Sequence, residues 1–225
     1  MRALFLVFLF LAAPALAEQP QNIADLRSEI IGYIDSGSYS ADQMQAVQPG
    51  ITWLEWRAAQ SIPGEKLALV LDIDETSLSN MAAQRANGFS YFRTGACDHL
   101  PNGPCAWDAW VALGQATAVA PTLELFNAAR ASGIDVFFIT GRGESMHEAT
   151  VTNLEAVGYA DWAGITTKPE GLKVESAADY KAPARLAIEE SGYTIVLNVG
   201  DQPSDLAGGY AERTILLPNP MYRIP

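Results

Sequence analysis

Hydrophobic residues follow two different patterns along this chain. Within residues 22–60 they recur at helical spacing, around Leu26 and Ile30 and again around Trp53, and this spacing predicts helices. Four short and nearly continuous apolar runs come later: LALVL (67–71), IDVFFIT (134–140), YTIVLNV (193–199) and RTILLP (213–218). Runs of this length without a polar side predict strands that are buried on both faces of a sheet.

Helix signals occur between these runs. The segments PTLELFNAARASG (121–133) and RLAIEESG (185–192) both end in glycine, the residue that often terminates a helix. Strands that alternate with helices usually pair in parallel. We therefore predict an α/β fold, a Rossmann-like core with a parallel central sheet flanked by helices.

The first and second strands are separated by residues 77–120, which is long for a simple connection. We expect this segment to be an insertion, a small and mainly helical cap that lies over the site. Its aromatic residues include Tyr91 and Trp110. They have two interpretations: they fill a small core between cap and sheet, or they form a stacking wall that binds the organic part of a substrate.

Composition and charge narrow the class of protein. The 225 residues are 49% hydrophobic and 18% charged, and they carry 14 Lys and Arg against 26 Asp and Glu, a net charge of -12. This composition predicts one main globular domain. The excess of acidic over basic residues argues against a nucleic-acid polymer or an anionic membrane as partner, because both require a basic protein surface. The composition leaves open whether the chain forms a homo-oligomer.

The first seventeen residues, MRALFLVFLFLAAPALA, resemble a signal peptide: Arg2, an apolar block, then small residues before Glu18. They predict export, with cleavage after Ala17 and a mature domain over residues 18–225 in the periplasm or outside the cell. An uncleaved anchor is the alternative, but the apolar block is shorter than the roughly 20 residues of a spanning helix. We expect no stable membrane span after cleavage.

The two cysteines, Cys97 and Cys105, flank a turn-rich segment. In an exported protein, an even number of cysteines at short spacing favours a disulfide. Zinc is the alternative because His99 lies between them, but a fourth ligand is missing.

Polar residues follow the ends of three predicted strands. Asp72 and Asp74 follow the first; the others are Thr140, Gly141 and Arg142 after the second, and Asp201 and Asp205 after the third. A single aspartate after a strand is most often a turn former or a helix cap. Together, however, they point to one ligand site, because the carboxyl ends of parallel strands meet at one edge of a sheet.

The acidic residues at this edge are candidate metal ligands: Asp72, Asp74, Asp201 and Asp205. Oxygen-only ligands indicate a hard cation, and Mg²⁺ fits best. An EF-hand is excluded because its glycine and glutamate positions are occupied by Ser77 and Ala83. The chain also lacks a GxGxxG after the first strand, a GxxxxGK[ST] and a GxSxG, so dinucleotide, P-loop and serine-hydrolase chemistry have no support.

Four segments carry a resemblance to a known family: LDIDET, FFITGR, DYKAPAR and VGDQPSDL. In order and spacing they resemble the motifs of the haloacid dehalogenase superfamily, and most closely those of its secreted acid phosphatases, a group that includes plant vegetative storage proteins. The resemblance extends to NLEAVGY and to the ending RTILLPNPMY. One departure is Pro203, where members of this group often have tryptophan.

The resemblance implies roles for the acidic residues. Asp72 is implied to be the nucleophile that forms an aspartyl-phosphate, and Asp74 the acid and base that protonates the leaving group and then activates water. Mg²⁺ is implied to bind Asp72, Asp201 and the backbone carbonyl of Asp74, with Asp205 holding its water shell. Dehalogenases of the superfamily do not need an acid at position 74, so its presence favours a phosphatase.

The remaining roles concern the phosphoryl group. Thr140 and the Gly141 N–H are implied to bind its oxygens, and Lys181 to neutralise its charge. Lys168 and Lys173 are alternative lysines. Arg142 either binds substrate or supports the acidic loop, and the sequence does not decide between them.

These observations predict a Mg²⁺-dependent acid phosphatase that hydrolyses small phosphate monoesters, namely aryl phosphates and nucleoside monophosphates. Two alternatives remain at this point. One is a catalytically weak storage or binding protein with the same fold, and the other is a phosphotransferase that passes the phosphoryl group to an alcohol.

Overall fold

The computed structural model describes residues 19–225. The predicted signal peptide and its cleavage site after Ala17 lie outside the described residues. Within the described part of the chain, no helix combines the length and the apolar character needed to cross a bilayer.

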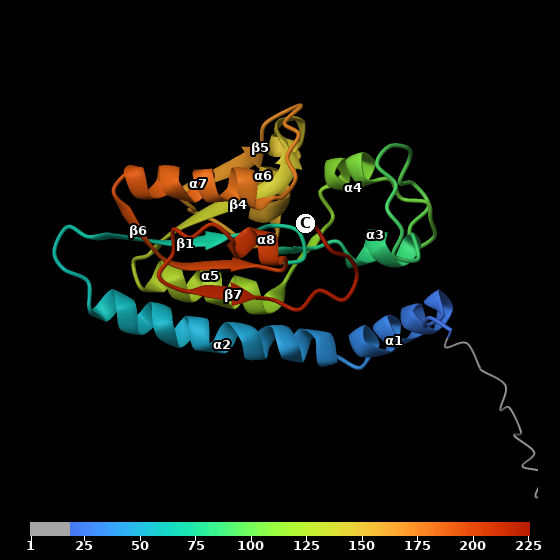
Figure 1. Cartoon of the computed structure of the whole chain (residues 1–225), viewed down its shortest axis with the longest axis horizontal. Helices are drawn as coiled ribbons and strands as arrows, with labels where there is room; N and C mark the ends of the chain where they lie inside the picture. The colour runs from blue at the N-terminus through green and yellow to red at the C-terminus, as the bar shows by residue number, and fades with distance from the viewer. Residues whose placement is uncertain (1–18) are drawn as a thin grey trace, which may run out of the picture.

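A five-stranded parallel sheet forms the centre of the molecule (Figure 1). Its strand order is β5-β4-β1-β6-β7, so the first strand lies in the middle and later strands are added on both sides. The predicted α/β fold with a parallel sheet is confirmed, and all four predicted runs contain strands. The strands are β1 (Lys66–Leu71), β4 (Asp135–Gly143), β5 (Gly164–Lys168), β6 (Tyr193–Gly200) and β7 (Thr214–Leu216).

The hydrophobic pattern does not predict β5. Its sequence is GITTK, and none of its five residues is fully buried. The strand forms because β4 offers it an edge: Phe138 pairs with Ile165, and Ile139 pairs with Thr166. A short edge strand depends on backbone hydrogen bonds to its neighbour more than on burial of its own side chains, so its sequence carries a weak signal.

Both faces of β1 are buried, as its continuous apolar run predicts. Leu67, Leu69 and Leu71 belong to the larger hydrophobic cluster, whereas Ala68 and Val70 belong to a smaller cluster on the opposite face. Successive side chains of a strand point to opposite sides, so one run supplies two cores. Burial on both faces holds β1 firmly in the middle of the sheet.

Helices cover the two faces of the sheet. Helices α2 (Ser38–Ala59) and α5 (Ala120–Ala131) pack together below the sheet in Figure 1, and α7 (Ala178–Glu190) covers the other face. Helix α1 (Ile23–Asp35) lies next to α2, so the segment 22–60 is helical as predicted. Shorter helices follow strand ends: η1 (Glu144–Met146) and α6 (His147–Ala156) after β4, and α8 (Pro203–Leu206) after β6.

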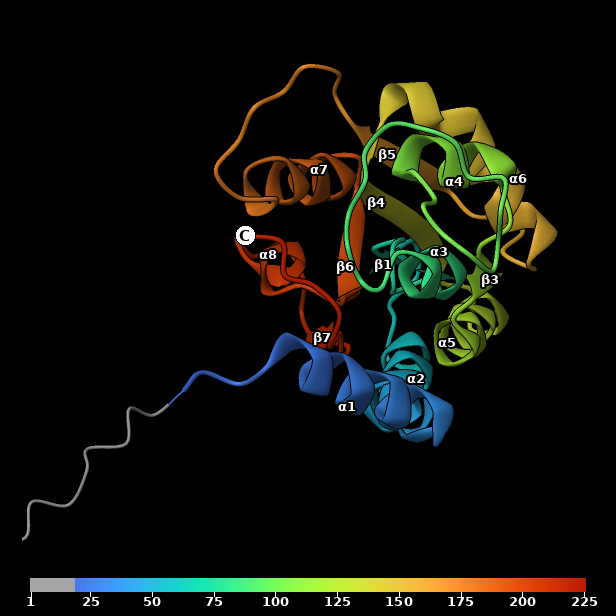
Figure 2. The same cartoon turned by 90° about the vertical axis from the view of Figure 1, so that its right-hand side faces the viewer.

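The insertion between β1 and β4 forms the cap, which stands at the right of Figure 1 and faces the viewer in Figure 2. It is less helical than expected, because residues 87–106 form neither helix nor strand. That stretch contains three glycines and two prolines, which disfavour regular structure. Its regular elements are β2 (Leu78–Ser79), α3 (Met81–Ala86), α4 (Trp107–Leu113) and β3 (Thr117–Ala118).

A disulfide between Cys97 and Cys105 closes the irregular part of the cap. The prediction of a disulfide is confirmed, and the zinc alternative with His99 is excluded because the two sulfur atoms are bonded to each other. Asn87 attaches this loop to the end of α3. Its side chain donates to the Cys105 carbonyl and accepts from the Cys105 N–H, both at 2.8 Å.

Candidate active site

The three central strands lie side by side at the edge of the sheet where β1 ends. Leu71 of β1 pairs with Phe138 of β4 and with Val199 of β6. The residues that follow these three therefore lie side by side, although β4 continues to Gly143 and β6 to Gly200. Strand β1 also stands where the strand order changes direction, which is where ligands bind in open parallel sheets.

A cavity of about 440 Å³ opens at this edge. Core and cap both contribute to its wall, and the residues at the end of the chain form a third side. The residues from the core include Asp72, Asp74, Lys181, Asp201 and Asp205, those from the cap include Phe89, Tyr91 and Trp107, and those from the end of the chain are Tyr222, Arg223 and Ile224.

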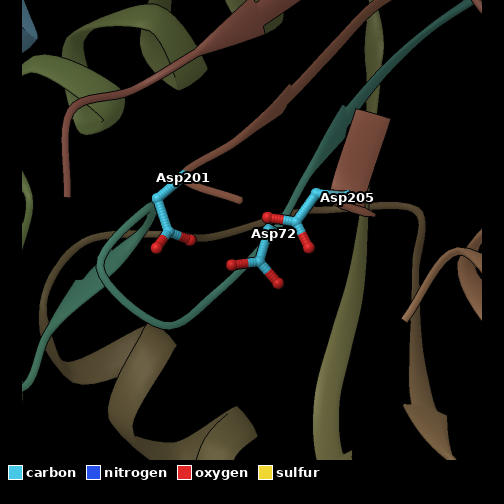
Figure 3. Close-up of side chains that lie close together, drawn as sticks. All are labelled: Asp72, Asp201 and Asp205. Atoms are coloured by element: carbon cyan, nitrogen blue, oxygen red, sulfur yellow. The ribbon is translucent and has the colours of Figure 1, made fainter. Parts of the chain in front are cut away.

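Three buried carboxylates meet at the bottom of the cavity. Asp72 follows β1, Asp201 follows β6 and Asp205 lies in α8, yet one oxygen atom of each lies within 4.8 Å of the others (Figure 3). The close approach of Asp205 requires glycine at position 200, because a Cβ there would lie 2.4 Å from the Cβ of Asp205. Asp205 also accepts a hydrogen bond from the Gln202 N–H at 2.9 Å, so it caps α8 as well.

Lys181 lies directly against this cluster. Its Nζ lies 2.5 Å from Oδ1 of Asp72 and 2.6 Å from Oδ1 of Asp205, and the residue is 4% exposed. Burial lowers the pKa of Lys181, but the charges of the two aspartates outweigh burial and raise it above its ordinary value. The alternative lysines, Lys168 and Lys173, line a separate neighbouring cavity.

The cluster carries more negative than positive charge. Burial, followed by the charges of the neighbouring aspartates, raises the pKa of Asp72 well above its usual range despite Lys181. Burial and Asp205 likewise raise the pKa of Asp201 to about 6. Three carboxylates beside one ammonium group leave an excess that a divalent cation would balance, and buried oxygen ligands at this spacing fit such a cation.

Asp74 is paired with Arg142. Arg142 is 2% exposed, and its Nη2 and Nε lie 2.7 Å and 3.1 Å from Oδ1 of Asp74. A further hydrogen bond from Nη1 to Thr150 and the ring of Trp107, whose centroid lies 5.5 Å away, hold the guanidinium in place. Arg142 is thus hydrogen-bonded to the acidic loop, and it also lines the cavity, so its role as a substrate contact stays a prediction.

Thr140 and Gly141 lie beside this pair. Thr140 is fully buried, and its hydroxyl oxygen accepts the Arg142 N–H at 3.1 Å. Gly141 is exposed and lines the cavity, where a Cβ would lie 3.0 Å from the Tyr180 hydroxyl. Strand β4 continues to Gly143, but its pairing with β5 is irregular between Ile139 and Gly143. The predicted strand end is thus an irregular stretch of a longer strand.

Comparison with known families agrees with this arrangement. Residues 9–225 match the family described as HAD superfamily, subfamily IIIB (acid phosphatase). The chain belongs to this family. The resemblance drawn from the four motifs is therefore confirmed.

Several relatives of this subfamily IIIB chain are known. Acid phosphatase 1 of Solanum lycopersicum is 35% identical over 158 residues, which cover 69% of this chain and 58% of the relative. Vegetative storage protein 1 of Arabidopsis thaliana is 34% identical over 157 residues, 69% of this chain and 55% of the relative. The matched part thus spans little more than half the length of these relatives. The class C acid phosphatase from Bacillus anthracis shares the fold, with a TM-score of 0.68, 23% identity, and coverage of 89% of this chain and 86% of that one.

The aromatic wall of the subfamily IIIB site differs from the prediction at one residue. Tyr91 lines the cavity as predicted, but Trp110 does not belong to its wall. Trp110 is 2% exposed, and its Nε1 donates to Oδ1 of Asn80 at 2.8 Å, which satisfies the one polar atom of the buried indole. The tryptophan at the cavity is Trp107, whose ring centroid lies 6.4 Å from that of Tyr91. The prediction of Trp110 as a substrate contact is therefore wrong.

A buried polar network next to Asp74 has no signal in the sequence. Glu75 is 1% exposed, and its carboxylate accepts hydrogen bonds from the Asn80 N–H at 2.8 Å, from the Asn80 side chain at 3.1 Å and from the Tyr222 hydroxyl. Burial, followed by the charge of Asp74, raises the pKa of Glu75 to about 8. Glu75 and Asn80 resemble ordinary polar loop residues in the sequence, and Tyr222 lies 147 residues away from Glu75.

Three hydrogen bonds that the sequence does not indicate orient Asp201. The Nε2 of Gln202 and the Nδ2 of Asn219 each donate to its Oδ2 at 2.6 Å, and the Thr76 hydroxyl donates to its Oδ1 at 3.2 Å. The segment PNPMY is noticed in the sequence only as part of the family resemblance. The structure adds that Asn219 and Tyr222 of this segment hold residues of the site.

The raised pKa values predict how the stability of the metal-free protein depends on pH. In the folded chain Glu75 and Asp201 have pKa values of about 8 and about 6, against ordinary values of 4.5 and 3.8. At a pH between the ordinary pKa and the folded-state pKa of either group, the folded state binds more protons than the unfolded state. A rise in pH over this range therefore favours unfolding. From about pH 5 to about pH 8 we expect a loss on the order of a few kcal/mol, or roughly 5 to 10 °C in unfolding temperature.

Thermal unfolding followed by circular dichroism in a chelating buffer measures this effect. The Asp201→Asn variant removes one of the two groups, so its unfolding temperature should fall less steeply with pH. An unfolding temperature that rises steadily over the same range contradicts the prediction.

Proposed function

We propose that this chain is a Mg²⁺-dependent phosphatase that hydrolyses phosphate monoesters through an aspartyl-phosphate on Asp72. The observation that carries the proposal is the cluster of Asp72, Asp201 and Asp205 at the bottom of one cavity, where Lys181 bonds to Asp72 and Asp205 and Asp74 lies in the wall. Membership of an acid phosphatase family supports it.

The first chemical step is the transfer of the phosphoryl group to Asp72. Lys181 binds Oδ1 of Asp72, so Oδ2 is the oxygen that bonds to phosphorus. As that bond forms, the bond between phosphorus and the ester oxygen breaks. The leaving oxygen takes the proton of the Asp74 carboxyl group, which becomes a carboxylate.

The second step returns the enzyme to its starting state. The Asp74 carboxylate takes a proton from a water molecule, whose oxygen bonds to the phosphorus of the aspartyl-phosphate. The bond from phosphorus to Asp72 then breaks, which releases inorganic phosphate and regenerates both groups. Thr140, the Gly141 N–H and Lys181 stabilise the negative charge on the phosphoryl oxygens in both steps.

The carboxylate oxygens of Asp72, Asp201 and Asp205 are metal ligands of the kind that fits Mg²⁺. Asp72, Asp201 and the backbone carbonyl of Asp74 would hold it, with Asp205 on its water shell. When bound, the ion neutralises phosphoryl charge that would otherwise repel the carboxylates.

The cap determines which organic groups are accepted. Tyr91 and Trp107 line both the cavity of about 440 Å³ and a neighbouring cavity of about 600 Å³. Aromatic side chains at this junction favour flat organic groups, which supports aryl phosphates and nucleoside monophosphates as substrates.

A storage protein of the same fold is the second candidate, since one similar protein is named a vegetative storage protein. Phosphotransfer to an alcohol is the third, because the aspartyl-phosphate can react with either acceptor. The complete carboxylate cluster, with Lys181 bonded to Asp72 and Asp205, favours catalysis over storage.

Export to the periplasm or to the outside of the cell is part of the proposal. Its support is the composition of residues 1–17 and the disulfide in the cap, since disulfides persist in oxidising compartments.

The function is tested by phosphate release from 4-nitrophenyl phosphate and from a nucleoside monophosphate. We expect release with Mg²⁺ and a loss of at least about 100-fold after chelation, which added Mg²⁺ reverses. Added glycerol distinguishes hydrolysis from transfer, because transfer yields glycerol phosphate. No release from either substrate with Mg²⁺ present, or equal rates with the chelator, contradicts the proposal.

A further inference from the structure

Asn80 lies at the junction of the cap and the acidic loop. It is 1% exposed and directly precedes α3. Its Nδ2 donates to Oδ1 of Asp74 at 3.0 Å and to Oε2 of Glu75 at 3.1 Å, and its Oδ1 accepts from Nε1 of Trp110 at 2.8 Å. All the polar atoms of its carboxamide therefore have partners, and one partner is Asp74.

The partners of Asn80 determine which way its carboxamide faces. An indole N–H can only donate, so the atom that faces Trp110 must be the carbonyl oxygen of Asn80. The NH₂ group then faces Asp74 and Glu75, where it donates one hydrogen to each. Trp110 lies in α4, so the cap contributes directly to this orientation.

Glu75 holds the other side of Asn80. Its Oε1 accepts the backbone N–H of Asn80, its Oε2 accepts the side-chain NH₂, and the Tyr222 hydroxyl bonds to Oε2 as well. A polar network that is satisfied at every member is rigid. Asn80 is therefore fixed by the loop after β1 and by Trp110 of the cap, and the end of the chain holds Glu75 in turn.

This network distinguishes the two oxygens of the Asp74 carboxyl group. Oδ1 accepts Nδ2 of Asn80 at 3.0 Å, Nη2 of Arg142 at 2.7 Å and Nε of Arg142 at 3.1 Å. Oδ2 accepts one long hydrogen bond, from Nε of Arg142 at 3.3 Å. Asp74 lines the cavity, so Oδ2 is the oxygen with capacity left for a substrate.

We propose that Asn80, oriented by Trp110 and Glu75, is a positioning residue that holds the Asp74 carboxyl group so that Oδ2 delivers the proton to the leaving oxygen. The inference rests on the proposed function. It adds that protonation of the leaving group depends on a buried amide at the base of the cap, which connects the position of the cap to the chemistry.

The test compares two phosphate esters that differ in their need for a proton. 2,4-Dinitrophenyl phosphate has a good leaving group that departs without protonation, whereas 2-phenylethyl phosphate has a poor leaving group that needs an acid. In Asn80→Ala, kcat/KM for 2-phenylethyl phosphate should fall at least about tenfold, and kcat/KM for 2,4-dinitrophenyl phosphate should change less than about threefold. Because kcat/KM includes loss of the leaving group but not the later hydrolysis, it isolates the protonation step.

The chain offers a matched control in Asn153, which is 2% exposed and is hydrogen-bonded on both sides to the backbone of Ala116, at 3.1 Å and 2.8 Å. Asn153→Ala makes the same chemical change at another contact of the cap, where the bonds go to Ala116 and not to Asp74, so it should lower both rates by a similar factor. If Asn80→Ala does not fold, Trp110→Phe removes the indole donor while keeping an aromatic ring. It should change the ratio of the two rates in the same direction.

The outcomes separate the inference from the proposed function. A ratio that stays at the wild-type value in the Asn80 and Trp110 variants, or that shifts equally in Asn153→Ala, overturns the positioning role while the phosphatase activity stands. A wild-type chain that releases phosphate from neither ester removes the proposed function, and this inference with it.

Discussion

Replacing Asp72 by asparagine is expected to abolish phosphate release, with kcat at least about 10⁴-fold lower. Asparagine preserves the size of the side chain but replaces the anionic oxygen that attacks phosphorus with an amide. The remaining groups of the site, including Lys181 and Asp74, can still bind the ester. No nucleophile is then present to attack phosphorus. Phosphate release measured with Mg²⁺ on 4-nitrophenyl phosphate gives the size of the loss.

A suitable control for this variant is Asp98→Asn, because the side chain of Asp98 is 65% exposed in the cap and lies outside the cavity wall. It should keep the wild-type rate. Beryllium fluoride with Mg²⁺, a mimic of the aspartyl-phosphate, should raise the unfolding temperature of the wild-type chain and leave that of Asp72→Asn unchanged. An Asp72→Asn variant that keeps more than about one hundredth of the wild-type rate is incompatible with Asp72 as nucleophile.

Replacing Lys181 by methionine is expected to affect both stability and activity. The ammonium group forms ion pairs with Asp72 and Asp205, and its removal leaves these buried carboxylates without a cationic partner. The metal-free protein should lose about 3 to 5 kcal/mol of stability, the usual cost of breaking a buried ion pair. Phosphate release should fall about 100- to 1,000-fold, because the phosphoryl oxygens lose one of the positive charges that stabilise them.

Denaturant unfolding in a chelating buffer measures the change in stability, and Mg²⁺ should restore part of it because a cation would again balance the cluster. Lys173→Met is the matched control: Lys173 is exposed and lines the neighbouring cavity, so both properties should stay near the wild-type values. Unchanged stability in metal-free Lys181→Met would mean that the ion pairs with Asp72 and Asp205 contribute little.

The elements that the sequence predicts well are those whose signal is local. The run LALVL (67–71) is apolar on both sides because β1 is buried on both sides, and this can be seen without knowing its neighbours. Strand β5 is different, because GITTK becomes a strand only by pairing with β4. The cap differs for a related reason: residues 87–106 have no helical pattern, and their conformation is held by the disulfide and by Asn87.

Candidate site residues also differ in whether a local sequence signal indicates them. Asp72, Asp74 and Asp201 follow strand ends in the sequence, so elementary sheet geometry already places them at one edge. Lys181 has no such signal, and only the family resemblance indicates it. The tryptophans of the cap could not be assigned from the sequence: both Trp107 and Trp110 belong to α4, yet one lines the cavity and the other bonds to Asn80.

The amino-acid sequence by itself determined the parallel α/β core, the edge at which polar residues gather, the disulfide and the family, because each depends on local pattern or on motifs in fixed order. Only the tertiary structure decided the partners of the buried polar groups: Arg142 with Asp74, Asn80 between Asp74 and Trp110, and Tyr222 with Glu75. A buried donor or acceptor must find a partner. Which partner it finds depends on how distant segments pack, and no local pattern records that.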